Sequence, residues 1–154
     1  MKPKILVTRE VFDETLAYLA QHCEVEANQQ DVAFSPEALA QRLAGKDGVM
    51  CCLTDRIDAG LLAACPQLKA AANIAVGYNN IDLAACTARG VMATNTPGVL
   101  DDSTADLAWA LMLATARRLT EVESYIRAGE WTGWRLKQWL GVDVHHATLG
   151  IIGM

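Results

Sequence analysis

The sequence lacks the features of a nucleic-acid-binding or membrane protein. Its 154 residues carry a net charge of −5, and no cluster of Lys or Arg is longer than the pair Arg117-Arg118. Nucleic acids and anionic membrane surfaces attract clustered positive charge, so we expect neither as a partner. No apolar run approaches the ~20 residues of a membrane span. No secretory signal precedes the first apolar run, at residues 4–8.

Cysteine is present, but without the spacing of a redox or metal site. The cysteines number five, and no two form a C-x-x-C pair: Cys23, Cys51, Cys52, Cys65 and Cys86. We interpret them as reduced, mostly buried small apolar side chains, which predicts a cytoplasmic protein. His145 and His146 are adjacent but have no third ligand at metal spacing, so we expect no metal site.

Hydrophobic residues are abundant, at 52 % of the chain, and they follow an alternating pattern. Short β-rich runs lie at residues 4–8, 23–27, 48–53, 68–75 and 91–94. Helical patterns lie between them, at residues 11–23, 35–45, 58–65 and 82–89. Ser35 and Asp58 are the expected N-caps, and Gly90 is the expected stop of the last helix. Regular β–α alternation with short connections predicts a parallel sheet with helices on both faces. We therefore predict a flavodoxin-like, doubly wound α/β domain over residues 1–98.

The pattern changes over residues 99–146. Several N-cap residues at 101–104, with Ser103 and Asp106 as a variant capping box, predict the start of a long helix. This helix is expected to run to about residue 128, where Gly129 stops it. Its first half, residues 105–116, is almost wholly apolar. A helix that is apolar all round must be covered all round, so we expect it to pack between two domains or two subunits.

The second half of this helix is polar, and an irregular segment follows it. Glu123 and Arg127 have the spacing of an ion pair on one helix face. Three of the four tryptophans then fall within nine residues, at Trp131, Trp134 and Trp139. Clustered Trp in an irregular segment indicates a contact surface. We assign residues 99–146 to a long helix and a crossover segment for dimerisation.

The last residues, 147–154, have the pattern of a strand that enters a phosphate-binding turn. Gly153 and Met154 fit the first two positions of the motif G-x-G-x-x-G. We therefore predict that this run is the first strand of a Rossmann domain, and that most of that domain lies beyond Met154.

Three stretches together resemble the D-2-hydroxyacid dehydrogenase family. They are residues 73–82 (NIAVGYNNID), 94–106 (TNTPGVLDDSTAD) and 147–154 (ATLGIIGM). Within the family, the similarity is to glyoxylate/hydroxypyruvate and 2-ketogluconate reductases. The resemblance implies a flavodoxin-like substrate domain, with an inserted Rossmann domain that binds NAD or NADP. It also implies that the catalytic arginine, glutamate and histidine all lie downstream of Met154, so that this chain contains no catalytic residue and is inactive alone.

The resemblance also implies substrate-binding residues in this chain. The backbone N–H groups of Val76 and Gly77 would hold the carboxylate of a small 2-oxo or 2-hydroxy acid, and Leu53 would form a wall of the pocket. Adjacent N–H groups near a glycine form an anion nest, and parallel sheets bind ligands at the carboxyl ends of their strands. Phosphite dehydrogenases carry lysine in place of Val76, so valine favours a 2-oxo acid over phosphite. Plainer interpretations remain: Gly77 as a turn glycine, residues 78–80 as a solvated loop, and Leu53 as core.

Cofactor and dimer residues follow from the same resemblance. Thr104 would contact the cofactor near the nicotinamide, although it also fits a simple helix cap. Gly153 and Met154 would begin the turn that binds the pyrophosphate. Trp139 would reach the active site of the other subunit in a homodimer.

Two functions remain open from the sequence. The first is an enzyme whose complete chain reduces glyoxylate, hydroxypyruvate or 2-ketogluconate to the D-2-hydroxy acid with NAD(P)H. The second is a stand-alone, non-enzymatic flavodoxin-like module for dimerisation or partner binding. A chain that ends inside a strand motif favours the first.

Overall fold

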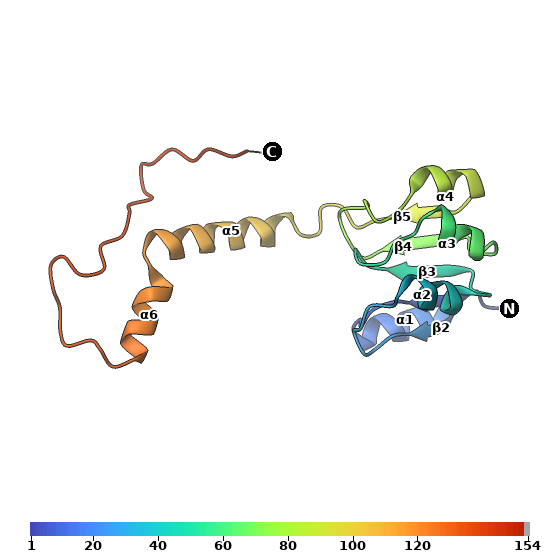
Figure 1. The fold of residues 1–154 in the computed structure, drawn as a ribbon, viewed down its shortest axis with the longest axis horizontal. Coiled ribbons are helices and arrows are strands. Elements are labelled where there is room, and N and C mark those ends of the chain that lie inside the picture. The colour runs from blue at the N-terminus through green and yellow to red at the C-terminus, as the bar shows by residue number, and fades with distance from the viewer. Residues whose placement is uncertain (153–154) are drawn as a thin grey trace. The chain divides into compact units, whose positions relative to one another are not determined.

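The structure is a computed structural model that describes residues 1–152. Two compact units make up the chain, Met1–Val99 and Leu100–Met154 (Figure 1). Gly153 and Met154, which we expect at the start of a phosphate-binding turn, lie outside the described residues.

The first unit contains a five-stranded sheet in the order β2-β1-β3-β4-β5, and every pair of neighbouring strands is parallel. Its strands are β1 (Lys4–Val7), β2 (Glu24–Ala27), β3 (Gly48–Cys51), β4 (Ala70–Asn73) and β5 (Met92–Thr94). The predicted α/β fold with a doubly wound parallel sheet is confirmed. Because all strands are parallel, their carboxyl ends lie at one edge of the sheet, where folds of this kind bind ligands.

Four helices alternate with these strands, and their ends lie where the sequence predicts them. The helices are α1 (Asp13–His22), α2 (Pro36–Leu43), α3 (Ala59–Ala64) and α4 (Leu83–Arg89). The side chains of Ser35, Asp58 and Asp82 each accept a hydrogen bond from the amide three residues on, at 3.2, 3.0 and 2.9 Å. Gly90 ends α4 with φ +68°, a left-handed conformation that glycine adopts at no steric cost.

The hydrophobic core lies between one face of the sheet and helices α2, α3 and α4. It contains Leu6, Val49, Cys51 and Ala71 from the strands, and Leu39, Leu43, Leu61, Leu62 and Cys86 from the helices. Helix α1 has no fully buried residue. Three buried residues in this unit are polar: Thr8, Asp55 and Asn73. Each of the three lies at or just beyond the carboxyl end of a strand. The buried polar residues therefore lie at the edge of the sheet where a ligand is expected to bind.

The second unit contains two helices, α5 (Asp101–Ala116) and α6 (Leu119–Arg127). The prediction of a single helix to about residue 128 is wrong. Arg118 takes a left-handed backbone conformation with φ +55°, which ends the helical repeat. The carbonyl of Ala116 instead accepts a hydrogen bond from the amide of Val142, at 2.8 Å. The crossover segment therefore satisfies a backbone group at the corner between the two helices.

The ends of this helical region also differ in part from expectation. Leu100 is the N-cap of α5 and provides no side-chain hydrogen bond, so the predicted capping box at Ser103 is wrong. The Ser103 hydroxyl lies inside the first turn and donates to the Leu100 carbonyl at 3.1 Å. The predicted stop at Gly129, with φ +70°, is confirmed, as is the ion pair between Glu123 and Arg127.

Residues 130–152 contain turns but no helix or strand. The strand expected from residue 147 is not formed among residues 147–152. A β-strand needs a neighbour that satisfies its backbone groups, and no described segment pairs with this one. Its assignment to a Rossmann domain stays a prediction. Among the described helices, none has both the length and the hydropathy of a membrane span.

Candidate functional site

The candidate site is built from the segments that follow β1, β3 and β4. These strands are neighbours, so Thr8, residues 52–57 and residues 74–81 all start at the same sheet edge. The register places Cys51 beside Asn73, the last residues of β3 and β4. The turn with Leu53 and the loop with Val76 and Gly77 therefore leave the sheet side by side.

The loop after β4 has two consecutive amides without an internal partner. In the described part of the chain, neither the Val76 N–H nor the Gly77 N–H donates a hydrogen bond. Their carbonyls, in contrast, are held. Asn95 Nδ2 donates to the Val76 carbonyl and Asn73 Nδ2 donates to the Gly77 carbonyl, both at 2.8 Å. The backbone is thus fixed by its acceptors while two adjacent donors stay free for an anion.

Gly77 is not required by the conformation of the chain. Its φ lies outside the left-handed range, and a Cβ placed there would meet no atom within 4 Å. The interpretation of Gly77 as a glycine required by a tight turn is therefore not supported. The missing side chain leaves open space beside the free amides of Val76 and Gly77.

Leu53 lies in the turn after β3 and is 63 % exposed, so its interpretation as a core residue is wrong. It lines an open pocket of about 410 Å³ together with residues of the loop after β4. The other lining residues are Thr54, Arg56, Asp58, Asn79, Asn80, Ile81 and Asp82. The structure thus brings the Leu53 turn and the Gly77 loop together, although Val76 and Gly77 are not among the lining residues.

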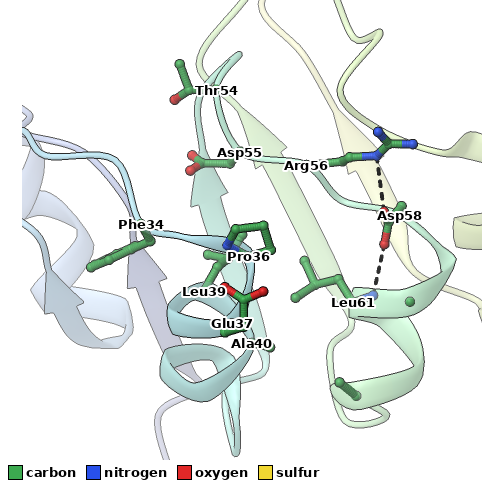
Figure 2. A pocket seen from close by; sticks show the side chains of 12 residues that line it. Phe34, Pro36, Glu37, Leu39, Ala40, Thr54, Asp55, Arg56, Asp58 and Leu61 are labelled. Atoms are coloured by element: carbon green, nitrogen blue, oxygen red, sulfur yellow. Dashed lines mark hydrogen bonds and ion pairs between the residues drawn. The ribbon is translucent and has the colours of Figure 1, made fainter.

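A second pocket, of about 390 Å³, lies between α2 and α3 (Figure 2). It contains none of the predicted site residues, and its lining is mainly apolar. Figure 2 shows that the Arg56 side chain turns toward Asp58, with which it forms an ion pair of 3.1 Å. The guanidinium of Arg56 is the one basic group in the lining, and Asp58 neutralises it. Glu37 adds a negative charge to the same pocket. This pocket does not suit an anionic ligand.

Sequence reasoning missed a hydrogen-bond network behind the two loops. Asp55 Oδ2 accepts from the Thr8 hydroxyl at 2.5 Å and from the Cys52 amide at 2.8 Å. Asn80 Nδ2 donates to the carbonyls of Cys52 and Asp55, at 3.1 and 3.0 Å. The interpretation of residues 78–80 as a solvated loop is therefore wrong for Asn80. The sequence did contain a signal for this network, namely short polar residues directly after apolar strands.

The cysteine beside this network is not a nucleophile. Burial, with a smaller contribution from the charge of Asp55, raises the pKa of the Cys51 thiol to about 12. Its Sγ donates a weak hydrogen bond to Asn73 Oδ1 at 3.6 Å. A thiol that stays protonated at neutral pH contributes packing rather than covalent chemistry. No group of three or more His, Cys, Asp or Glu within residues 1–152 is arranged to hold a metal ion.

Two predicted site residues lie in the second unit. Thr104 is exposed in the first turn of α5, and its amide donates to the Leu100 carbonyl at 2.9 Å. It is a helix-interior residue, so its interpretation as an N-cap is wrong. Trp139 packs on α6, where its ring lies 5.1 Å from the Tyr125 ring and 5.1 Å from the Arg118 guanidinium. Its indole Nε1 is buried and has no partner among the described residues.

The parallel sheet and its helices define a doubly wound α/β domain, and free amides at the carboxyl edge of such a sheet are a suitable place for a small anion. The comparison with known families is more specific. Residues 5–141 match the family described as D-isomer specific 2-hydroxyacid dehydrogenase, catalytic domain. The chain belongs to this family.

Relatives and solved structures agree with this assignment. The chain is 45 % identical to a glyoxylate reductase of Thermococcus onnurineus, over 99 % of this chain and 47 % of that protein. The chain thus spans about half the length of the curated relatives it matches. A D-isomer specific 2-hydroxyacid dehydrogenase from Polaromonas superposes with a TM-score of 0.85 at 33 % identity, over 92 % of this chain and 45 % of that one. An NADPH-dependent glyoxylate/hydroxypyruvate reductase of Sinorhizobium meliloti, in complex with NADP and malonate, superposes with a TM-score of 0.69 at 30 % identity, over 85 % and 40 %.

Proposed function

We propose that this chain is the substrate-binding part of an enzyme that reduces a small 2-oxo acid to the D-2-hydroxy acid with NADH or NADPH. The observation that carries the proposal is the pair of free amides at Val76 and Gly77, at the carboxyl end of β4. Two adjacent N–H donors on a fixed backbone match the two oxygens of a carboxylate. The 2-oxo acid is glyoxylate, hydroxypyruvate or 2-ketogluconate.

The other roles in substrate binding, cofactor binding and catalysis are assigned partly to this chain and partly to residues beyond it. Leu53, exposed at the next strand end, forms one wall of the substrate pocket. Thr104 contacts the cofactor, and Gly153 with Met154 begins its pyrophosphate turn. The bound nicotinamide supplies the hydride. The catalytic arginine, glutamate and histidine belong to residues after Met154, so the chain alone has no reductase activity.

The family relatives support a small carboxylate and a nicotinamide as ligands. The Sinorhizobium enzyme is NADPH-dependent and its structure contains NADP and malonate, a small dicarboxylate. The Thermococcus relative is a glyoxylate reductase. Neither observation chooses between NAD and NADP for this protein, and the residue that makes this choice follows the glycines of the Rossmann turn.

A homodimer is the partner that suits the second unit. From Leu107 onward helix α5 is almost wholly apolar, and its large apolar side chains are 46–60 % exposed: Leu107, Trp109, Leu111 and Leu113. Trp131 and Trp134 are also exposed, at 60 and 79 %. An apolar surface of this extent is typical of a subunit interface, and Trp139 would lie close to the partner's active site. The five free cysteines agree with a cytoplasmic location.

An assay of NAD(P)H oxidation tests the proposal. The complete protein is expected to oxidise NADH or NADPH in the presence of glyoxylate, hydroxypyruvate or 2-ketogluconate, and the 154-residue chain is not. Sedimentation of the complete protein at micromolar concentration is expected to give a dimer. Turnover by the chain alone, or binding of these acids by the complete protein without turnover, would overturn the proposal. The second outcome would favour a binding module.

A further inference from the structure

We propose that Asn80, paired with Asn73, is a positioning residue that holds the Val76–Gly77 loop against the Leu53 turn and thereby sets the affinity for substrate. This inference rests on the proposed function, because it assigns a role within the same site. It assigns to these two side chains the connection between the two segments proposed to hold the substrate.

The Asn80 amide group bridges two segments of backbone. Its Nδ2 donates to the carbonyls of Cys52 and Asp55, at 3.1 and 3.0 Å, and these carbonyls enclose the turn that presents Leu53. Asn80 itself lies three residues after Gly77 in the other loop. One side-chain NH₂ group thus connects the predicted pocket wall with the predicted carboxylate site.

Asn73 extends the bridge to the anion-binding amides. It is buried, with 2 % of its surface exposed, at the last position of β4. Its Nδ2 donates to the Gly77 carbonyl at 2.8 Å, and its amide group pairs with that of Asn80 at 3.2 Å in both directions. The orientation of Gly77 is therefore coupled through two side-chain amides to the Leu53 turn.

The chemistry of the partners fixes the orientation of both amide groups. Backbone carbonyls only accept hydrogen bonds, so the NH₂ group of Asn80 must face Cys52 and Asp55, and the NH₂ group of Asn73 must face Gly77. Asp at either position has the same shape but cannot donate. The side-chain NH₂ of asparagine, rather than its size, is what the network requires.

The loop also has a connection that does not depend on this side chain. The Ile57 amide donates to the Asn80 carbonyl at 2.8 Å, and the Asp82 amide donates to the Ile57 carbonyl at 2.9 Å. These backbone bonds hold the far end of the loop near α4. Loss of the Asn80 side chain is therefore expected to loosen the Val76–Gly77 end while the fold is kept.

The first test compares Asn80→Asp with Gln41→Glu in the complete enzyme. Gln41 is exposed on α2 and its side chain makes no hydrogen bond within the described residues, so its substitution adds the same charge away from the loops after β3 and β4. Asn80→Asp is expected to raise KM for the 2-oxo acid about tenfold with kcat within about twofold, because a fixed carboxylate site contributes to uniform binding. Gln41→Glu is expected to change KM less than about threefold. Asn80→Ala, which adds no charge, is expected to raise KM like Asn80→Asp.

The second test does not depend on activity. Hydrogen exchange in Asn80→Ala is expected to rise in residues 52–57 and in residues 74–82, and to stay unchanged in α2. A rise confined to residues 74–82 would overturn the bridging role, as would an unchanged KM in both Asn80 variants. If Asn80→Asp does not fold, Asn80→Ser keeps one donor and is expected to show the same changes at reduced size. If the wild-type enzyme reduces no 2-oxo acid, the proposed function fails, while the exchange pattern still decides whether the loops are coupled.

Discussion

The hydroxyl of Thr8 donates a hydrogen bond of 2.5 Å to the carboxylate of Asp55, and both residues are at most 2 % exposed. The bond joins the end of β1 to the turn after β3. Asp55 Oδ2 also accepts from the Cys52 amide, whereas Oδ1 has no partner among the described residues. A buried carboxylate is costly unless its oxygens are hydrogen-bonded, so Thr8 carries a large part of this compensation.

Substitution of Thr8 is expected to destabilise the first unit. Thr8→Val keeps the shape of the side chain but leaves a buried carboxylate oxygen with one fewer donor. The free energy of unfolding is expected to fall by about 1–3 kcal/mol, measured by denaturant unfolding. Thr94→Val is the control, because Thr94 is exposed on β5 and its hydroxyl makes no hydrogen bond in the described chain. Equal effects of the two substitutions would contradict the role given to Thr8.

Substitution of Gly77 is expected to separate binding from stability. Nothing lies within 4 Å of a Cβ at this position and its φ is ordinary, so Gly77→Ala has no internal clash. The unfolding free energy of the complete enzyme is expected to change by less than about 0.5 kcal/mol. In contrast, KM for the 2-oxo acid is expected to rise about tenfold or more, because the new methyl group enters the space beside the free amides. An unchanged KM would show that the carboxylate binds elsewhere.

Glu26 is expected to contribute stability that depends on pH. Its carboxylate accepts from Lys46 Nζ at 2.6 Å and from Arg42 Nη1 at 2.8 Å, and these hydrogen bonds, that of Lys46 first, lower the pKa of Glu26 below 4.5. A lowered pKa in the folded state means that the stabilisation is present above the unfolded-state pKa. It is lost as the pH falls through the folded-state value.

The test is the effect of Glu26→Gln on unfolding at several pH values. At pH 7 the substitution is expected to cost about 0.5–1 kcal/mol, a small value because the pair is partly exposed. The cost is expected to shrink below pH 4.5, the ordinary value for this carboxyl, and to disappear when Glu26 is protonated in the folded state. Glu24→Gln on the same strand is the control, since its nearest cation, Lys4, is 4.0 Å away. A cost that stays constant with pH would contradict this role.

Local signals explain which parts of the fold could be predicted from the sequence. Ser35, Asp58 and Gly90 act within one turn of their own helices, so their effects depend on nearby residues only. The parallel sheet follows from the β–α alternation, because a helix between two strands returns the chain so that the next strand runs parallel to the first. The predictions at Ser35, Asp58 and Gly90 were confirmed because they required no knowledge of distant contacts, whereas the equally local capping box at Ser103 was wrong.

The parts that could not be predicted depend on distant backbone. The break at Arg118 accompanies a hydrogen bond from Val142 to Ala116, and nothing near Arg118 in the sequence indicates that partner. Likewise, nothing in the sequence distinguishes Asn80 from the other polar residues of its loop. Its role becomes visible only in the structure, where the carbonyls of Cys52 and Asp55 lie beside its side chain. Glycine-rich loops and caps can be recognised from residue type, but the acceptors of a side-chain amide cannot.

The corner between α5 and α6 gives the last prediction. Gly141 lies against this corner, and a Cβ there would clash with the Ala116 carbonyl oxygen and lie 3.2 Å from the Arg117 Cα. Both neighbours are backbone atoms, which cannot move aside without displacing the helix end. Gly141→Ala is therefore expected to break the hydrogen bond from Val142 to Ala116, at a cost of about 1–3 kcal/mol to local stability.

Hydrogen exchange at the Val142 amide measures this effect in the complete protein. Protection of that amide is expected to fall by about tenfold or more in Gly141→Ala, because 1.4 kcal/mol corresponds to one factor of ten. Gly150→Ala is the control, since a Cβ at Gly150 would meet nothing within 4 Å. The same change in both variants would mean that the crossover segment does not pack on the helix corner. A change in Gly141→Ala alone would show that one glycine allows the close approach that ends α5.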